Sequence, residues 1–317
     1  MCFFYYYNNI YKMTLYKNIT EAFGNTPLVE INHPNSKGKI YAKLEFYNPS
    51  KSIKDRLAIA MVSNAENTGK LKKGGVIIEA SSGNTGIALA MIASAKGYKC
   101  IIVMPSAVSA ERKELLKAYG AEVILTDAEL GMQGATKKAE EIAIESDGLL
   151  MEQFKNLSGP LIHYNTTGAE ILSDLNGNLD FLVSGIGTGG TISGTGKRLK
   201  EHDKNIKVIG VQPASSSIFT GGSPGSHKIS GIGPNFIPEI YDDKIVDEII
   251  SISDDEAWEN SRWLGRNTGI LAGISSGATF SAALKISERS VNKNKKIVVI
   301  FASYGERYLS TNVYNTR

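Results

Sequence analysis

The sequence predicts an α/β fold in which mostly parallel sheets are covered by helices. Short runs of β-branched and aliphatic residues alternate with amphipathic stretches from Lys39 onward, as they do in βαβ units. The runs IIVM at 101–104 and IVVIF at 297–301 are apolar throughout, which is typical of strands buried on both faces. The chain has 317 residues, 42% of them hydrophobic, so it is long enough for two domains.

The alternation places the elements along the chain. Strands are expected at 40–44, 76–80, 100–104, 122–126, 181–184, 208–211 and 297–302, and helices at 55–65, 86–95, 110–119, 135–145 and 192–200. A polar stretch at 156–160 predicts an N-terminal domain over 13–155 and a C-terminal domain over 156–317, with the earliest segment free to cross to the other domain. Residues 221–233 are rich in Gly, Ser and Pro, which indicates a long functional loop.

Residues 1–12, MCFFYYYNNIYK, are interpreted as an extension outside the core, with Met13 as a natural start. They have no basic leader and no cleavage motif, so they do not resemble a signal peptide. No run of about 18 apolar residues is present, and two cysteines cannot build a disulfide framework. The net charge of only +3 argues against a primary role in nucleic-acid binding. We therefore expect a cytoplasmic protein without nucleic-acid or membrane partners.

A glycine-rich loop follows the strand at 181–184 and precedes a helix; it consists of Gly187, Thr188, Gly189, Gly190 and Thr191. Glycines let backbone amides approach an anion, and the amino end of a helix favours negative charge. The loop lacks the lysine of a nucleoside-triphosphate P-loop. A dinucleotide site requires an acidic residue at the end of the next strand, where this chain has Gln212. The pattern favours a phosphate site without a ribose partner over a purely structural turn.

Three further loops carry polar side chains at expected helix starts. The loop SSGNTG at 81–86 suits a carboxylate, although simple helix capping is the alternative. Lys54 lies in NPSKSIKDR at a helix start, where the dipole lowers an amine pKa as a Schiff-base lysine requires, unless it is a solvated surface lysine. In GISSGA at 273–278, a serine is either a cap or a partner for a heterocyclic nitrogen.

Competing chemistries find little support in the sequence. The four histidines show no metal-ligand spacing, so no metal site is expected. There is no GxSxG nucleophile motif. Cys100 opens an apolar strand and is interpreted as a core residue rather than a nucleophile.

In their order and combination, these segments resemble the pyridoxal-phosphate enzymes of the tryptophan-synthase-β group (fold type II), and within it the cysteine synthase (O-acetylserine sulfhydrylase) family. The similarity runs from Met13 to Thr311 and includes NITEAFGNTPLVEI at 18–31, GGSPGSHKISGIG at 221–233 and SYGERYLST at 303–311. It implies two open, twisted, mostly parallel sheets flanked by helices, with the active site between two domains. It also implies pyridoxal 5'-phosphate as cofactor and a homodimer.

The resemblance implies roles for individual residues. Lys54 would form the internal aldimine, Asn84 would contact the 3'-oxygen of the cofactor, and Ser275 would face the pyridine nitrogen. The loop at 187–191 would hold the phosphate. The substrate α-carboxylate would be held by Ser81, Ser82, Thr85 and Gln153. The chain departs from the family pattern at Ser81, where the family usually has Thr, at Gln212, where it has Glu, and at Ala302, where it often has Pro.

The activity implied by the resemblance is β-replacement of acetate in O-acetyl-L-serine by sulfide, which gives L-cysteine. External aldimine and aminoacrylate would follow the internal aldimine, and Lys54 would move the Cα proton. Two alternatives stay open. One is a sibling β-replacement enzyme, either similar to cystathionine β-synthase or using O-phosphoserine. The other is a low-turnover regulatory protein that binds the C-terminal tail of serine acetyltransferase.

Overall fold

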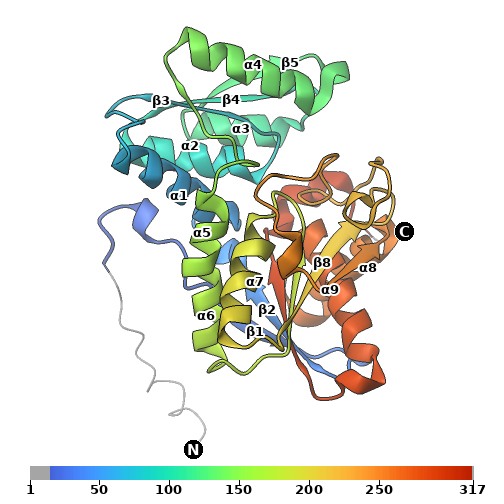
Figure 1. Cartoon of the computed structure of the whole chain (residues 1–317). Coiled ribbons are helices and arrows are strands. Elements are labelled where there is room, and N and C mark those ends of the chain that lie inside the picture. Colours follow the sequence, from blue (N-terminus) through green and yellow to red (C-terminus); the bar gives the residue numbers. More distant parts are fainter. Residues whose placement is uncertain (1–14, 316–317) are drawn as a thin grey trace, which may run out of the picture.

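Two sheets organise the computed structural model, which describes residues 15–315 (Figure 1). The predicted extension at 1–12 lies outside the described residues, as do 13–14 and 316–317. Both sheets are flanked by helices, so the predicted fold class is confirmed. No helix within residues 15–315 is long and apolar enough to cross a membrane.

The smaller sheet is parallel and contains four strands in the order β5-β4-β3-β6. Residues alternate between its faces, because successive side chains of a strand point to opposite sides. Ile77 lies in the cluster built with helices α1 and α2, and its neighbour Ile78 lies in the cluster built with α4. The elements are α1 (Lys54–Asn67), β3 (Val76–Ala80), α2 (Asn84–Lys96), β4 (Lys99–Pro105), α3 (Ala110–Ala118), β5 (Glu122–Thr126), α4 (Gly131–Glu145) and β6 (Leu149–Leu150).

The larger sheet contains six strands in the order β1-β2-β10-β7-β8-β9, of which only β1 runs antiparallel to its neighbour. Leu182 contributes to a core with α7, whereas Val183 contributes to a core with α9, so helices cover both faces. The elements are β1 (Leu28–Ile31), β2 (Lys39–Leu44), α5 (Ser158–Asn165), α6 (Thr167–Asp174), β7 (Phe181–Gly185), α7 (Gly190–His202), β8 (Lys207–Pro213), β9 (Glu248–Ile252), α8 (Asp254–Thr268), α9 (Ile274–Glu288) and β10 (Lys296–Phe301).

The early strands β1 and β2 belong to the larger sheet, beside the late strand β10. In Figure 1 these blue strands lie in the lower part of the molecule, whereas β3, β4 and β5 lie in the upper part. The chain therefore leaves the larger sheet after β2, builds the smaller sheet, and returns. The division of the chain into domains at residues 155 and 156 stays a prediction.

A buried ion-pair network fixes α1, the helix that begins at Lys54. The Arg56 guanidinium donates to Glu45 at 2.7 and 2.8 Å and to Glu170 at 2.6 and 2.7 Å. Lys43 Nζ also lies 3.0 Å from Glu170. Burial raises the pKa of Glu170, but the hydrogen bonds and charge of Arg56 outweigh it and lower that pKa to about 2. Since Glu45 follows β2 and Glu170 lies in α6, the network joins α1 to the larger sheet and its helices.

The close crossing of α8 and α9 yields a stability prediction. A Cβ on Gly277 would lie 2.1 Å from the Ala257 carbonyl oxygen and 2.2 Å from Ser261 Oγ, so Gly277→Ala forces the helices apart. We expect this variant to lower the free energy of unfolding by about 2 kcal/mol, measured by denaturant titration. The control is Gly265→Ala in α8, whose Cβ would meet only Leu271 at an ordinary 3.6 Å. Equal stability of both variants would contradict the close crossing.

Candidate active site

A pocket at the carboxyl end of β7 gathers residues from four of the predicted loops. It lies between the first turn of α1 and the amino ends of α7 and α9. The predicted site residues that line it are Lys54, Gly187, Thr188, Gly189, Thr191 and Ser275. Gly231 and Ile232, from the predicted functional loop at 221–233, complete one wall. The structure thus brings together side chains that lie up to 221 positions apart, from Lys54 to Ser275.

Lys54 is the reactive group that stands out in this pocket. Burial lowers the pKa of its amine from the ordinary value of 10.5 to about 8, because a charged ammonium loses hydration there. Among residues 15–315, the hydrogen bonds and ion pairs include none from Lys54 Nζ to a carboxylate. A substantial fraction of the amine is therefore neutral near pH 7–8, as a nucleophile or a base requires. A solvated surface lysine does not have this environment.

The glycine-rich loop forms a cradle that only glycine permits at two positions. A Cβ on Gly187 would lie 2.6 Å from the Gly231 carbonyl oxygen. Gly189 has a φ of +86°, and its Cβ would lie 2.7 Å from that of Tyr241. No side chain caps α7, so the first backbone N–H groups of this helix remain available to a ligand. Together with the hydroxyls of Thr188 and Thr191, they suit an anion such as phosphate.

A buried histidine supports this cradle, and sequence reasoning missed it. His163 Nε2 lies 3.2 Å from Thr191 Oγ1, and its Nδ1 lies 2.9 Å from Thr167 Oγ1. Burial, helped by the charges of Arg56 and Lys54, holds the pKa of His163 well below its usual range, so the ring is neutral. The histidines were considered only as metal ligands. The spacing of His163 and Thr167 allows their contact, but nothing in the local pattern shows that the ring reaches Thr191, 28 positions away.

Ser275 lies in the first turn of α9 and is buried. Its side chain does not cap the helix, because α9 has no side-chain cap hydrogen bond. The position of a Cβ on Gly231 lies 3.8 Å from Ser275 Oγ, so the hydroxyl borders the bare backbone of this loop. A neutral hydroxyl in this place suits a neutral heterocyclic nitrogen.

The loop at 81–86 does not line the Lys54 pocket. Ser81 Oγ accepts from the backbone N–H groups of Gly83 and Gly86, at 3.3 and 3.1 Å, so this hydroxyl also serves the local turn. Thr85 donates to Gln153 at 2.6 Å. The predicted site residues that the structure leaves outside the lining of the pocket are Ser81, Ser82, Asn84, Thr85, Gln153 and, within the glycine-rich loop, Gly190.

Arg307 connects the two groups of residues. Its guanidinium donates to Asn84 Oδ1 and to the backbone carbonyl of Ser50, four positions before Lys54. The Asn84 amide nitrogen is thereby turned away from Arg307. Sequence reasoning noted the segment SYGERYLST but did not single out its arginine. Nothing in the local pattern shows that this side chain reaches a loop 223 positions away.

The residues present fit pyridoxal phosphate. One pocket holds an amine of lowered pKa for an aldehyde, a cradle of N–H and hydroxyl donors for a phosphate, and a neutral hydroxyl for a ring nitrogen. Gly187 and Gly189 leave bare backbone where any side chain would collide. The amine, the N–H and hydroxyl donors, and the neutral hydroxyl thus correspond to the aldehyde, the phosphate and the pyridine nitrogen of that cofactor.

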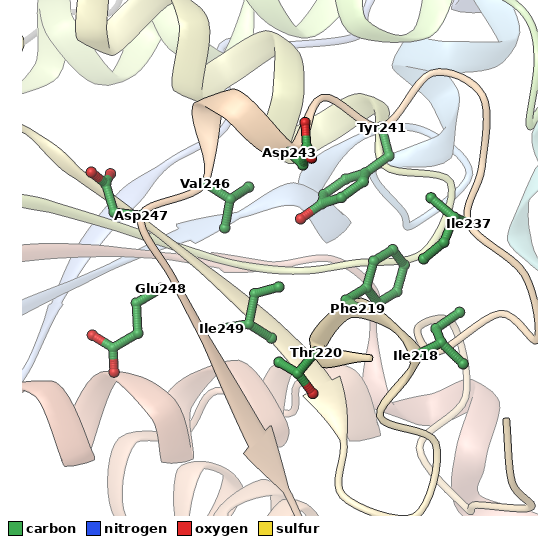
Figure 2. A pocket seen from close by; sticks show the side chains of 10 residues that line it. All are labelled: Ile218, Phe219, Thr220, Ile237, Tyr241, Asp243, Val246, Asp247, Glu248 and Ile249. Atoms are coloured by element: carbon green, nitrogen blue, oxygen red, sulfur yellow. The ribbon is translucent and has the colours of Figure 1, made fainter. Parts of the chain in front are cut away.

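A second hollow, of about 620 Å³, is larger than the pocket around Lys54, of about 30 Å³ (Figure 2). The ring of Phe219 packs against that of Tyr241 there, with centroids 4.9 Å apart. Two of its carboxylates are already paired, Asp247 with Lys200 and Glu248 with Arg289. The larger volume does not make this hollow the better candidate for the active site. Its lining contains no amine of lowered pKa and none of the predicted site residues.

Comparison with known proteins indicates the same cofactor. A family model described as "Pyridoxal-phosphate dependent enzyme" matches residues 19–303. A cysteine synthase from Staphylococcus aureus is 45% identical over 94% of this chain and 97% of its own length. The crystal structure of cysteine synthase (OASS) from Entamoeba histolytica has a TM-score of 0.93 at 43% identity, and covers 96% of this chain and 93% of that one.

A further solved structure is that of an enzyme named for a different activity. The O-acetylserine dependent cystathionine beta-synthase from Helicobacter pylori has a TM-score of 0.90 at 40% identity, and covers 95% of this chain and 100% of that one. The match of the family model extends from before β1 to beyond β10 and includes both sheets. The chain therefore belongs to the family of pyridoxal-phosphate-dependent enzymes.

Proposed function

We propose that this enzyme is a cysteine synthase, which replaces the acetate of O-acetyl-L-serine by sulfide and releases L-cysteine and acetate. The observation that carries the proposal is the lowered pKa of the Lys54 amine, which lies in one pocket with the loop at 187–191 and Ser275. The similarity to cysteine synthases over nearly the whole chain supports it.

The residues of the pocket would hold the cofactor at three points. Lys54 would hold the aldehyde, the loop at 187–191 would hold the phosphate with His163 behind Thr191, and Ser275 would face the ring nitrogen. Asn84, oriented by Arg307, would turn its amide toward the 3'-oxygen. When bound, pyridoxal phosphate supplies an electron sink for the bond changes at Cα. A serine hydroxyl does not stabilise a protonated ring nitrogen as a carboxylate does, which favours elimination over transamination.

Lys54 also moves the proton in this proposal. Once free, its Nζ takes the proton from the substrate Cα, and the acetate oxygen leaves Cβ with the bonding electrons. Hydrosulfide then forms a bond to Cβ, and Nζ returns a proton to Cα. An amine whose pKa is about 8 suits both directions, because it gains and loses a proton readily near neutral pH.

The substrate carboxylate would be held by Ser81, Ser82, Thr85 and Gln153. These residues belong to the part of the chain that builds the smaller sheet, and they lie outside the lining of the Lys54 pocket. We infer that the part of the predicted domain over 13–155 that builds the smaller sheet moves toward the larger sheet when the carboxylate binds, while β1 and β2 stay with the larger sheet. Such closure would exclude water from the pocket.

The partner predictions belong to the same proposal: the enzyme acts as a homodimer in the cytoplasm, and a serine acetyltransferase tail can dock on it. Sulfide is the proposed acceptor. One similar enzyme is named an O-acetylserine dependent cystathionine beta-synthase. The acceptor that attacks Cβ, sulfide or another thiol, is therefore the point to test.

A substrate comparison tests the proposed function. The purified holoenzyme is given O-acetylserine with either sulfide or homocysteine, and the products are separated by chromatography. We expect cysteine as the main product, and no comparable rate when O-phosphoserine replaces O-acetylserine. Cystathionine as the main product would favour the sibling activity, and binding of O-acetylserine without turnover would favour the regulatory alternative.

Removing the proposed base tests the role of Lys54. We expect Lys54→Ala to lower the rate of cysteine formation at least about a thousandfold, because the variant loses both the attachment point and the proton carrier. The control is Lys70→Ala, which changes an exposed lysine just after α1 and should retain the rate of the parent enzyme. Cysteine formation by Lys54→Ala at a tenth of the parent rate would contradict the assignment.

The lowered pKa of Lys54 also predicts a pH dependence of stability in the cofactor-free protein. Below pH 8 the ammonium is costly to bury, whereas above pH 10.5 the amine is neutral in both the folded and the unfolded chain. We expect Lys54→Met to raise the free energy of unfolding by about 3 kcal/mol at pH 7. This gain should shrink as the pH rises from 8 toward 10.5, measured by denaturant titration at each pH. A stabilisation by Lys54→Met that does not change with pH would contradict burial of the ammonium as its cause.

A further inference from the structure

Glu79 is a buried acid in an otherwise apolar strand, and the reaction proposed above does not use it. It lies in β3, in the sequence VIIEA, with a side chain only 3% exposed. By strand alternation it shares the face of Ile77, which packs toward α1 and α2. A charged residue type in such a place is rare unless its polar atoms have partners.

A chain of hydrogen bonds joins Glu79 to the loop at 81–86. Gln153 Nε2 donates to Glu79 Oε1 at 3.0 Å, and Gln153 Oε1 accepts from Thr85 Oγ1 at 2.6 Å. All three side chains are buried. The second carboxyl oxygen, Glu79 Oε2, is buried and has no hydrogen-bond partner. In this arrangement the Thr85 hydroxyl donates its hydrogen to Gln153, so it cannot donate to a substrate. One carboxyl oxygen of Glu79 is left without a hydrogen bond.

We propose that Glu79 is a positioning residue, which acts through the Gln153 amide to set whether the Thr85 hydroxyl donates to Gln153 or to the substrate carboxylate. This inference rests on the proposed function, because it concerns the carboxylate of the amino-acid substrate.

Two arrangements of the three side chains follow from their donors and acceptors. An ionised Glu79 only accepts, so Gln153 must turn its NH₂ toward the carboxylate, and its oxygen then accepts a hydrogen bond from the Thr85 hydroxyl. A protonated Glu79 donates to Gln153 Oε1, which turns the NH₂ toward Thr85 Oγ1. The Thr85 hydroxyl hydrogen is then free to reach the substrate carboxylate. No net proton transfer is required.

The surroundings of Glu79 favour the protonated form near neutral pH. Burial raises its pKa to about 8, although the hydrogen bond from the Gln153 side chain opposes the shift. The Glu152 carboxylate raises it further. From β4, the Cys100 thiol faces Glu79 and is itself neutral, since burial raises its pKa to about 12. The donating arrangement is thus available below pH 8 and is lost above it.

Calorimetric binding of L-alanine to the holoenzyme tests this inference, because L-alanine carries the carboxylate and lacks a leaving group. L-Alaninamide, which lacks the carboxylate, is the control ligand. We compare the parent with Glu79→Gln, which stays neutral at every pH and can both donate and accept. The matched core variant is Ile77→Val, on the same face of the strand.

Between pH 7 and pH 9.5, we expect the L-alanine Kd of the parent to rise about three- to tenfold more than that of Glu79→Gln, the loss expected for one hydrogen bond. Ile77→Val should follow the parent, and L-alaninamide should show no difference between the proteins. The KM for O-acetylserine should change in the same direction as Kd, with kcat nearly constant.

Identical pH dependence of the L-alanine Kd in the parent and Glu79→Gln would overturn the inference, and so would an equal change for L-alaninamide. Failure of the proposed function is distinguishable, because the parent would then form no cysteine, whereas the comparison of the L-alanine Kd between the parent and Glu79→Gln requires no turnover. A loss of stability alone would affect Ile77→Val as well as the Glu79 variant, and would not depend on the carboxylate of the ligand.

Discussion

The position of α1 determines the whole site, and the Arg56 guanidinium fixes that position. Arg56 is fully buried and divides its hydrogen bonds between Glu45, beside β2, and Glu170 in α6. Buried charges are retained where their partners satisfy them with good geometry, as two-oxygen contacts with both carboxylates do here. Because Lys54 lies two residues before Arg56, the same contacts aim its amine at the end of β7.

The site divides its tasks between the two sheets. The larger sheet supplies the anion cradle at the start of α7 and the neutral hydroxyl at the start of α9. The smaller sheet supplies the loop at 81–86, in which Thr85 depends on Gln153 and Glu79. Arg307 reaches from the last part of the chain to Asn84 and Ser50, so it links the loops that the sheets support. The phosphate loop and Ser275 thus belong to one support and the proposed carboxylate residues to the other, together with Asn84.

Sequence reasoning succeeded where the signal was local. The seven predicted strands all occur within two residues of their expected ends, because β-branched runs between turns define them. It missed β1, β6 and β9, which are short or lie at sheet edges, and the helices α5, α6, α8 and α9. Of these helices, α9 is buried along most of its length, so its sequence has no polar face to reveal it. The residues of the Lys54 pocket were predicted from polar and glycine-rich loops at the ends of strands and the starts of helices. His163 and Arg307 could not be found this way, because their roles depend on contacts between distant segments.

The state of Cys100 has a consequence for an enzyme whose proposed product is itself a thiol. Within residues 15–315, Cys100 is the free cysteine; it is buried, and its pKa is raised to about 12. Exchange with cystine or persulfides requires an accessible thiolate, which this residue does not provide. The described part of the enzyme is therefore chemically resistant to mixed-disulfide formation with its own product, even where sulfur compounds accumulate.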